Sequence, residues 1–209
     1  AGEYVKTTST INSAPRFDHN PATGKSLGLL VEEARTNLLT RSNFATIGSL
    51  GGVVRTLTTE INPLGGANAR RLQCTGDNQA HRFNFGHSSS NTVTVSAFVK
   101  KDTHRYVLIG YGGLSNSFTA LFDIEPGLTS DRLLGQGIKG NATNNANISA
   151  GYQDYPNGWV RIWATGTTTG SNGFSLQLAP NATAFSLNGW TADGTEAIYV
   201  WGGQLEDDA

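Results

Sequence analysis

The stretch Thr92–Lys101 reads TVTVSAFVKK, and apolar residues alternate in it with polar or aromatic ones. One set of alternate positions is Val93, Val95, Ala97 and Val99, and the other is Thr94, Ser96, Phe98 and Lys100. Successive side chains of a β-strand point to opposite faces, so a period of two is typical of a strand with one buried face. The stretch therefore predicts a strand whose valine face contributes to a core.

Similar short segments, rich in β-branched and aromatic residues, recur along the chain between clusters of Gly, Asn, Ser and Pro. We expect further strands at Ala69–Thr75, His81–Phe85, Tyr106–Tyr111, Phe118–Ile124, Ala146–Tyr152, Trp159–Thr169, Phe174–Leu178 and Ala197–Leu205. The turn sequence Asp154–Gly158 (DYPNG) predicts a hairpin before Trp159. Many short strands with few helical signals indicate an all-β domain, a two-sheet antiparallel β-sandwich of the jelly-roll kind.

Three stretches carry more specific expectations. In the predicted strand Trp159–Thr169, Trp159 shares a face with Arg161 and Trp163. We expect Trp159 to pack inward. Trp201 lies in an apolar strand, which predicts a place in the core. The segment Leu27–Leu39 fits either a short helix or a strand and turn, and Gly135–Asn147, rich in Gly and Asn, is expected to be a surface loop.

The first part of the chain differs in character from the rest. Pro15–Pro21 and Ser26–Glu32 flank the turn sequence Ala22–Lys25, which favours a hairpin. We therefore expect residues 1–40 to form an N-terminal hairpin or extension packed on a main domain, residues 41–209.

Length and charge limit the classes of function. The 209 residues suit one large all-β domain, and a net charge of −1 provides no basic surface for nucleic acid or an anionic membrane. No apolar run approaches the roughly 18 residues that a membrane span needs, so we expect no membrane insertion. The single cysteine, Cys74, has no partner for a disulfide, and we expect it in the core.

Catalytic motifs are missing from the sequence. It contains neither a G-x-S-x-G nucleophile motif nor an H-E-x-x-H zinc motif. Asp123 and Glu125 resemble the paired carboxylates of sandwich glycosidases, but they lie at the predicted end of a strand, where solvated side chains are the simpler interpretation. The four histidines are scattered and are not expected to be ligands. We expect no catalytic residues and no cofactor, with calcium at Glu206–Asp208 as an open alternative to a solvated chain end.

The aromatic residues are the better functional candidates. A sugar ring has apolar C–H faces and a hydroxyl rim, so it suits an aromatic ring with polar side chains beside it. Trp163 lies on the mixed face with Arg161, and Trp190 lies in a polar, loop-like stretch. The candidate ligand-binding residues are Trp163, Trp190, Tyr111, Arg161, Phe98, Lys100 and Arg105.

Several segments resemble known proteins. Pro15–Pro21 followed by Gly24–Leu39, together with Asn157–Arg161 and Tyr199–Glu206, is similar to segments of bacteriophage tail and other structural proteins. Val93–Lys101 is similar to a V-x-A-x-V-K strand of jelly-roll carbohydrate-binding modules, which have a concanavalin A-like sandwich fold. The resemblance implies a polysaccharide or cell-surface glycan as partner, a location on a virion tail or outside the cell, and display on homotrimers.

The sequence thus predicts a non-catalytic carbohydrate-binding module. A structural or assembly domain of a tail protein, whose aromatic residues only fill a core or an interface, is the first alternative. A jelly-roll polysaccharide lyase or hydrolase is the second, and the missing catalytic motifs disfavour it.

Overall fold

The computed structural model shows a β-sandwich. It describes residues 17–19, 26–29, 37–39, 42–45, 48–89, 91–112, 118–138, 148–167, 171–185 and 189–207. The chain divides into two units, Ala1–Arg35 and Thr36–Ala209, a division that falls before residue 40. In the first unit, β1 (Phe17–His19) pairs antiparallel with β2 (Ser26–Leu29), and residues 30–36, on which the helix-or-strand expectation partly falls, lie outside the described residues.

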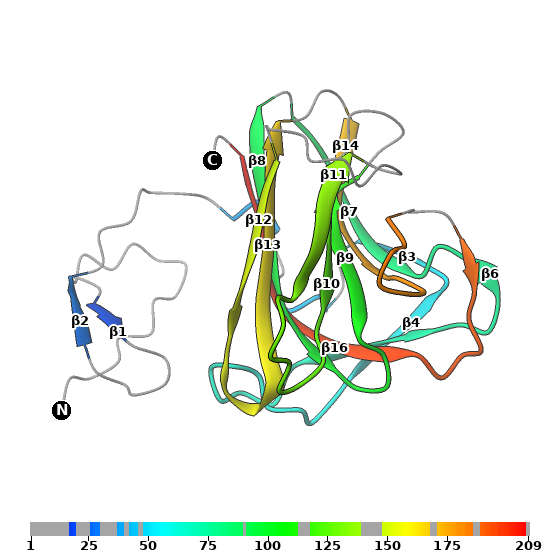
Figure 1. Ribbon diagram of the computed structural model, residues 1–209, viewed down its shortest axis with the longest axis horizontal. Coiled ribbons are helices and arrows are strands. Elements are labelled where there is room, and N and C mark those ends of the chain that lie inside the picture. Colours follow the sequence, from blue (N-terminus) through cyan, green and yellow to red (C-terminus); the bar gives the residue numbers. More distant parts are fainter. Residues whose placement is uncertain are drawn as a thin grey trace. The chain divides into compact units, whose positions relative to one another are not determined.

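The second unit consists of two six-stranded antiparallel sheets that form two layers (Figure 1). The β9 sheet has the order β11 (Leu133–Ile138), β10 (Phe118–Asp123), β9 (Tyr106–Tyr111), β14 (Ser171–Leu178), β7 (Arg82–Ser88) and β3 (Ser49–Gly51). The β8 sheet has the order β12 (Ile148–Asp154), β13 (Trp159–Thr167), β8 (Thr92–Lys101), β16 (Ala197–Asp207), β5 (Arg70–Cys74) and β4 (Val53–Leu57). The chain crosses repeatedly between the layers, and the predicted sandwich of the jelly-roll kind is confirmed at the level of this fold class.

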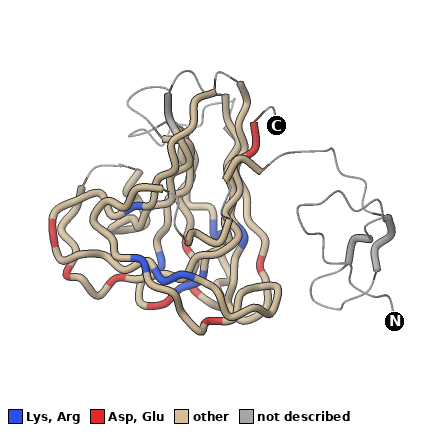
Figure 2. Tube along the Cα trace, turned by 180° about the vertical axis from the view of Figure 1, so that it is seen from behind, with Lys and Arg blue, Asp and Glu red and all other residues tan. Residues whose placement is uncertain are grey.

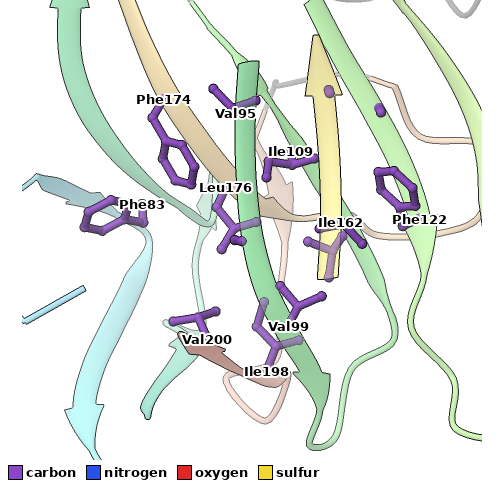
Figure 3. Packing of buried hydrophobic residues seen from close by; sticks show 14 of the residues in the cluster. Phe83, Val95, Val99, Ile109, Phe122, Ile162, Phe174, Leu176, Ile198 and Val200 are labelled. Atoms are coloured by element: carbon purple, nitrogen blue, oxygen red, sulfur yellow. The ribbon is translucent and has the colours of Figure 1, made fainter. Parts of the chain in front are cut away.

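The core lies between the two sheets. Figure 3 shows side chains of β8, β13 and β16 facing side chains of β7, β9, β10 and β14. The four alternate residues of β8 from Val93 to Val99 are fully buried, as their period of two predicts. Cys74 is also buried there, and burial raises the pKa of its thiol to about 12.

Turns and glycines position the strands around this core. The hairpin between β12 and β13 turns through the 3₁₀ segment Pro156–Gly158, where Asn157 and Gly158 have φ values of 62° and 77°. Such positive values suit asparagine and glycine. A short pair, β6 (Asn78–Gln79) and β15 (Trp190–Thr191), completes the strands of the described residues. In those residues, no helix is long and apolar enough to cross a membrane.

Two sequence expectations are wrong in part. The expected loop Gly135–Asn147 begins inside β11, whose register with β10 includes Gly135 and Gly137, while residues 139–147 lie outside the described part of the chain. The pattern failed here because glycines in a strand supply no side chains to alternate. Trp201 lies outside the core, because β16 places its side chain on the outer face of the sheet opposite Phe98.

Candidate functional site

The outer face of the β8 sheet, which points away from the β9 sheet, gathers a group of aromatic and polar side chains. The strand register places Trp163 opposite Ser96, and Arg161 opposite Phe98. On the other side of β8, Trp201 lies opposite Phe98 and Gln204 lies opposite Ser96. We call this group the aromatic platform; its members are Ser96, Phe98, Lys100, Tyr155, Arg161, Trp163, Trp201 and Gln204.

Phe98 is the centre of the platform. Its ring meets the Tyr155 ring edge-on at a centroid distance of 4.9 Å and the tilted Trp201 ring at 5.6 Å. The Arg161 guanidinium carbon lies 5.9 Å from the Phe98 centroid. Aromatic contacts of this kind stabilise ring positions before any ligand arrives. The platform is therefore a pre-ordered surface.

Trp163 lies flat on the sheet because its neighbour on β12 is Gly151. A Cβ at Gly151 would lie 2.5 Å from Trp163 Cζ2, so any larger residue would displace the indole. The half-buried ring thus packs on the β12 backbone at Gly151. A partly exposed aromatic ring fixed in this way is suited to stacking on a sugar ring.

Polar groups fill the space between the rings. Gln204 Oε1 accepts hydrogen bonds from Arg161 Nη2 at 2.9 Å and from Ser96 Oγ at 3.1 Å. Arg161 Nε has no hydrogen-bond partner, and no carboxylate of the described residues pairs with this guanidinium. Nε is itself closed to solvent, so Arg161 can donate to ligand oxygens, such as those of sugar hydroxyl groups, only through its other nitrogens.

A β-bulge places both Trp201 and Gln204 on the platform. The register of β16 against β8 slips between these two residues, and Gly202 there has a φ of 61°. The extra residue in the bulged strand lets two residues that are three positions apart share a face. A strict period of two hides this, and the apolar sequence around Trp201 suggested a core residue instead. The indole is half-buried, and its Nε1 donates to Asn68 Oδ1 at 2.9 Å.

The loop from Thr58 to Asn68 borders the platform. Lys100 Nζ forms an ion pair with Glu60 Oε1 at 2.7 Å, so its ammonium is already engaged. Trp159 is fully buried, as expected. It does not pack into the core between the sheets, however, but lies on the platform side of the β8 sheet, opposite Lys100. There its Nε1 donates to the carbonyl oxygen of Ile61 at 2.8 Å. Trp159 thus anchors the loop that forms this border.

Four of the seven predicted site residues, Phe98, Lys100, Arg161 and Trp163, lie together on the platform, and the other three do not. Tyr111 is fully buried in the core, where its hydroxyl donates to the carbonyl oxygen of His87 and burial raises its pKa to about 12. Its ring has no free face for a ligand.

Trp190 and Arg105 also lie away from the platform. The Trp190 ring packs between His81 and His104, at centroid distances of 4.8 Å and 6.0 Å, and its Nε1 donates to a backbone carbonyl. Arg105 binds Asp123 through two nitrogens, and these hydrogen bonds raise the pKa of the guanidinium. Both residues are thus occupied by packing or pairing.

The acidic residues with catalytic potential are engaged in ion pairs. Asp123 is buried rather than solvated; burial raises its pKa, but hydrogen bonds from Arg105 and the Glu125 amide outweigh burial and lower it. Glu125 binds Lys101 at 2.7 Å. A carboxyl group with a lowered pKa is a poor general acid near neutral pH.

Metal ligation finds little support in the geometry. No group of three or more His, Cys, Asp or Glu side chains among the described residues is arranged to hold a metal ion. At the acidic chain end, Asp207 accepts a hydrogen bond from Ser89 Oγ at 2.7 Å, and Asp208 lies beyond the described range.

Comparison with known proteins adds no family to this picture. No protein-family model matches the chain, and no curated protein matches its sequence.

Proposed function

We propose that this protein is a non-catalytic carbohydrate-binding module that holds a polysaccharide or cell-surface glycan on the aromatic platform. The observation that carries the proposal is the Trp163 indole lying flat over Gly151, one strand away from the Phe98–Trp201 ring pair. Arg161 and Gln204 lie between these rings and supply donors and acceptors for hydroxyl groups. The engaged carboxylates Asp123 and Glu125 support the non-catalytic part of the proposal.

The proposal includes a location on a virion tail or outside the cell, and display on homotrimers. Both rest on the sequence resemblance. A shallow, wet site binds a single glycan weakly, and linking several copies raises the avidity.

Affinity electrophoresis against a panel of polysaccharides, followed by titration with the best binder, tests the function. Replacing Trp163 or Trp201 by Ala should weaken binding about fivefold or more, since a central aromatic contact contributes more than about 1 kcal/mol. Trp190→Phe, which keeps an aromatic ring away from the platform, should bind like the wild type. Normal binding by both folded alanine variants would exclude the platform as the site.

A second candidate, an assembly domain, is favoured by exposed apolar side chains along one edge. Of the large hydrophobic residues that are exposed, Leu50, Val54, Leu57, Ile61 and Leu64 lie within one stretch of chain. β3 and β4 are also edge strands of the two sheets, and such edges can pair with another chain. Light scattering distinguishes the candidates: an oligomer that Leu57→Lys dissociates, in a protein that binds no glycan, would favour assembly.

A further inference from the structure

Two arginines, Arg55 on β4 and Arg70 on β5, lie on the inner face of the β8 sheet near its edge. The register pairs Arg55 with Leu72 and Arg70 with Val200, and both partners are fully buried core residues. The Arg55 guanidinium carbon lies 6.0 Å from the ring centroid of Phe83, a residue of the opposite sheet. The two side chains therefore point toward the β9 sheet, away from the aromatic platform.

Within the described part of the chain, neither arginine has a polar partner. Arg55 Nη1 and Arg70 Nε are buried without a hydrogen bond, and no ion pair joins either guanidinium to another described residue. Five other cations do form ion pairs: Arg71 with Asp102, Lys100 with Glu60, Lys101 with Glu125, Arg105 with Asp123 and Arg132 with Asp154. Figure 2 shows that acidic and basic residues are mixed along the described part of the second unit.

The arginine pair is electrostatically costly without an anion. Burial and the charge of Arg70 both lower the pKa of Arg55, which means that the environment disfavours its charged form. Buried polar nitrogens normally find a partner, and leaving one without costs free energy. As whole residues, Arg55 and Arg70 are half-buried.

We propose that Arg55 and Arg70 together bind one oxyanion group: a carboxylate, sulfate or phosphate. A guanidinium presents its N–H groups as a planar fork that matches the oxygens of such anions, and two forks can share one anion. Because Arg55 Nη1 and Arg70 Nε are closed to solvent, an anion would bond to them only after the two side chains turn outward, and it would then offset the repulsion between the two charges. This site goes beyond the proposed glycan binding, because it lies on the opposite face of the sheet from the platform.

The test titrates the protein with sodium sulfate and with phosphate at constant ionic strength, and follows thermal unfolding and heats of binding. Binding to the native state raises stability in a saturable way. Sulfate also stabilises proteins generally by exclusion from their surface, and the Arg55→Gln/Arg70→Gln double variant measures this background. We expect a saturable effect in the wild type, and affinity at least about tenfold lower in each single variant.

Arg82→Gln is the matched control. Arg82 also lacks a polar partner among the described residues, but it neighbours core residue Phe83 on β7 and so points to the outer face of the β9 sheet. This variant should keep the full anion effect. An equal response to sulfate in the wild type and the folded double variant would overturn the proposal. If the glutamine variants do not fold, Arg55→Lys and Arg70→Lys keep the charge without the fork, and wild-type affinity in both would equally overturn it.

The source of the anion is a separate arm of the test. Polygalacturonate and dextran sulfate carry acidic groups on a polymer, and neutral dextran does not. Polymer binding that the arginine variants lose and Trp163→Ala keeps would assign the site to acidic polysaccharides. Saturable binding of sulfate or phosphate without polymer binding would assign it to a free anion. The Trp163→Ala arm also separates a failure of this site from a failure of the platform.

Discussion

At the scale of the residue, the charged side chains at the end of β10 are held by specific partners. Asp123 receives hydrogen bonds from Arg105 Nε at 2.9 Å and from the Glu125 amide at 3.0 Å. Arg132, which is almost fully buried, donates to the carbonyl oxygens of Asp123 and Glu125. This network fixes the end of β10. Asp123 and Glu125, whose sequence resembles a catalytic carboxylate pair, therefore have a structural role here.

This network predicts a dependence of stability on pH. The pKa of Asp123 is lower in the folded state than in the unfolded chain, where an aspartate has a pKa of about 3.9. The ionised Asp123 side chain therefore contributes to the free energy of unfolding above that pH, and this contribution is lost as the pH falls through the folded-state pKa. Asp123→Asn should lower the free energy of unfolding at pH 7 by about 1–2 kcal/mol, an amount reduced by the partial exposure of Arg105.

Urea unfolding at pH 7 and pH 3 measures this effect. The difference between wild type and Asp123→Asn should shrink at the lower pH. Asp131→Asn, a change at an exposed carboxylate outside the network, should show a much smaller difference at either pH. A constant difference for Asp123→Asn would show that the charge of this residue contributes nothing.

At the scale of the element, the bulge in β16 shapes both faces of its sheet. Gly202 has a positive φ, and a Cβ there would lie 2.8 Å from Phe98 Cδ2 on the platform. A Cβ at Gly203 would lie 2.8 Å from Phe44 Cζ, and Phe44 is a core residue. Two adjacent glycines thus let the strand approach rings on opposite sides.

Alanine substitutions at the two glycines should have separable effects. Gly203→Ala overpacks the core and should destabilise the fold by about 1–3 kcal/mol in urea unfolding. Gly202→Ala should in addition weaken glycan binding, because it displaces Phe98 and strains a left-handed backbone. Gly86→Ala is the control, since a Cβ at this strand glycine meets nothing within 4 Å. Wild-type stability of Gly203→Ala would contradict the close packing described for the bulge.

The same elements show how far the sequence predicts the fold and the site. β8 and β13 could be predicted with their faces because their alternation is unbroken, and Phe98, Lys100, Arg161 and Trp163 followed from it. The bulge in β16 is a register slip, which leaves no trace in a hydrophobic pattern, so Trp201 and Gln204 were missed. The paired glycines Gly202-Gly203 were the one available signal.

At the scale of the whole molecule, the second unit is closed by contacts between its two ends. The Leu38 amide donates to the Leu205 carbonyl oxygen at 2.8 Å, and the Leu205 amide donates to Asn37 Oδ1 at 3.0 Å. Asn37 Nδ2 also donates to the Gly203 carbonyl oxygen at 3.2 Å. A single side chain therefore joins the start of the unit to the bulge of its last strand.

Asn37→Ala should destabilise the second unit by about 1–3 kcal/mol, because it leaves polar groups of the β16 backbone without partners. Urea unfolding followed by tryptophan fluorescence measures the change. Asn43→Ala, which removes only a local bond from the Ala45 amide, should cost clearly less. Equal losses in the two variants would mean that the long-range bonds of Asn37 add nothing.

The hydrogen bonds of Asn37 to the last strand hold the start and the end of the second unit close together, which makes the unit suitable for insertion into another protein. A domain whose chain enters and leaves at one point occupies no more of a host backbone than a loop does, so it can be spliced into an exposed turn without separating the strands on either side. The same geometry allows the order of the strands to be rearranged. A short linker joining residue 207 to residue 37, with new ends cut in the exposed Pro156–Asn157 turn, should give a permuted sandwich that folds and keeps its surfaces.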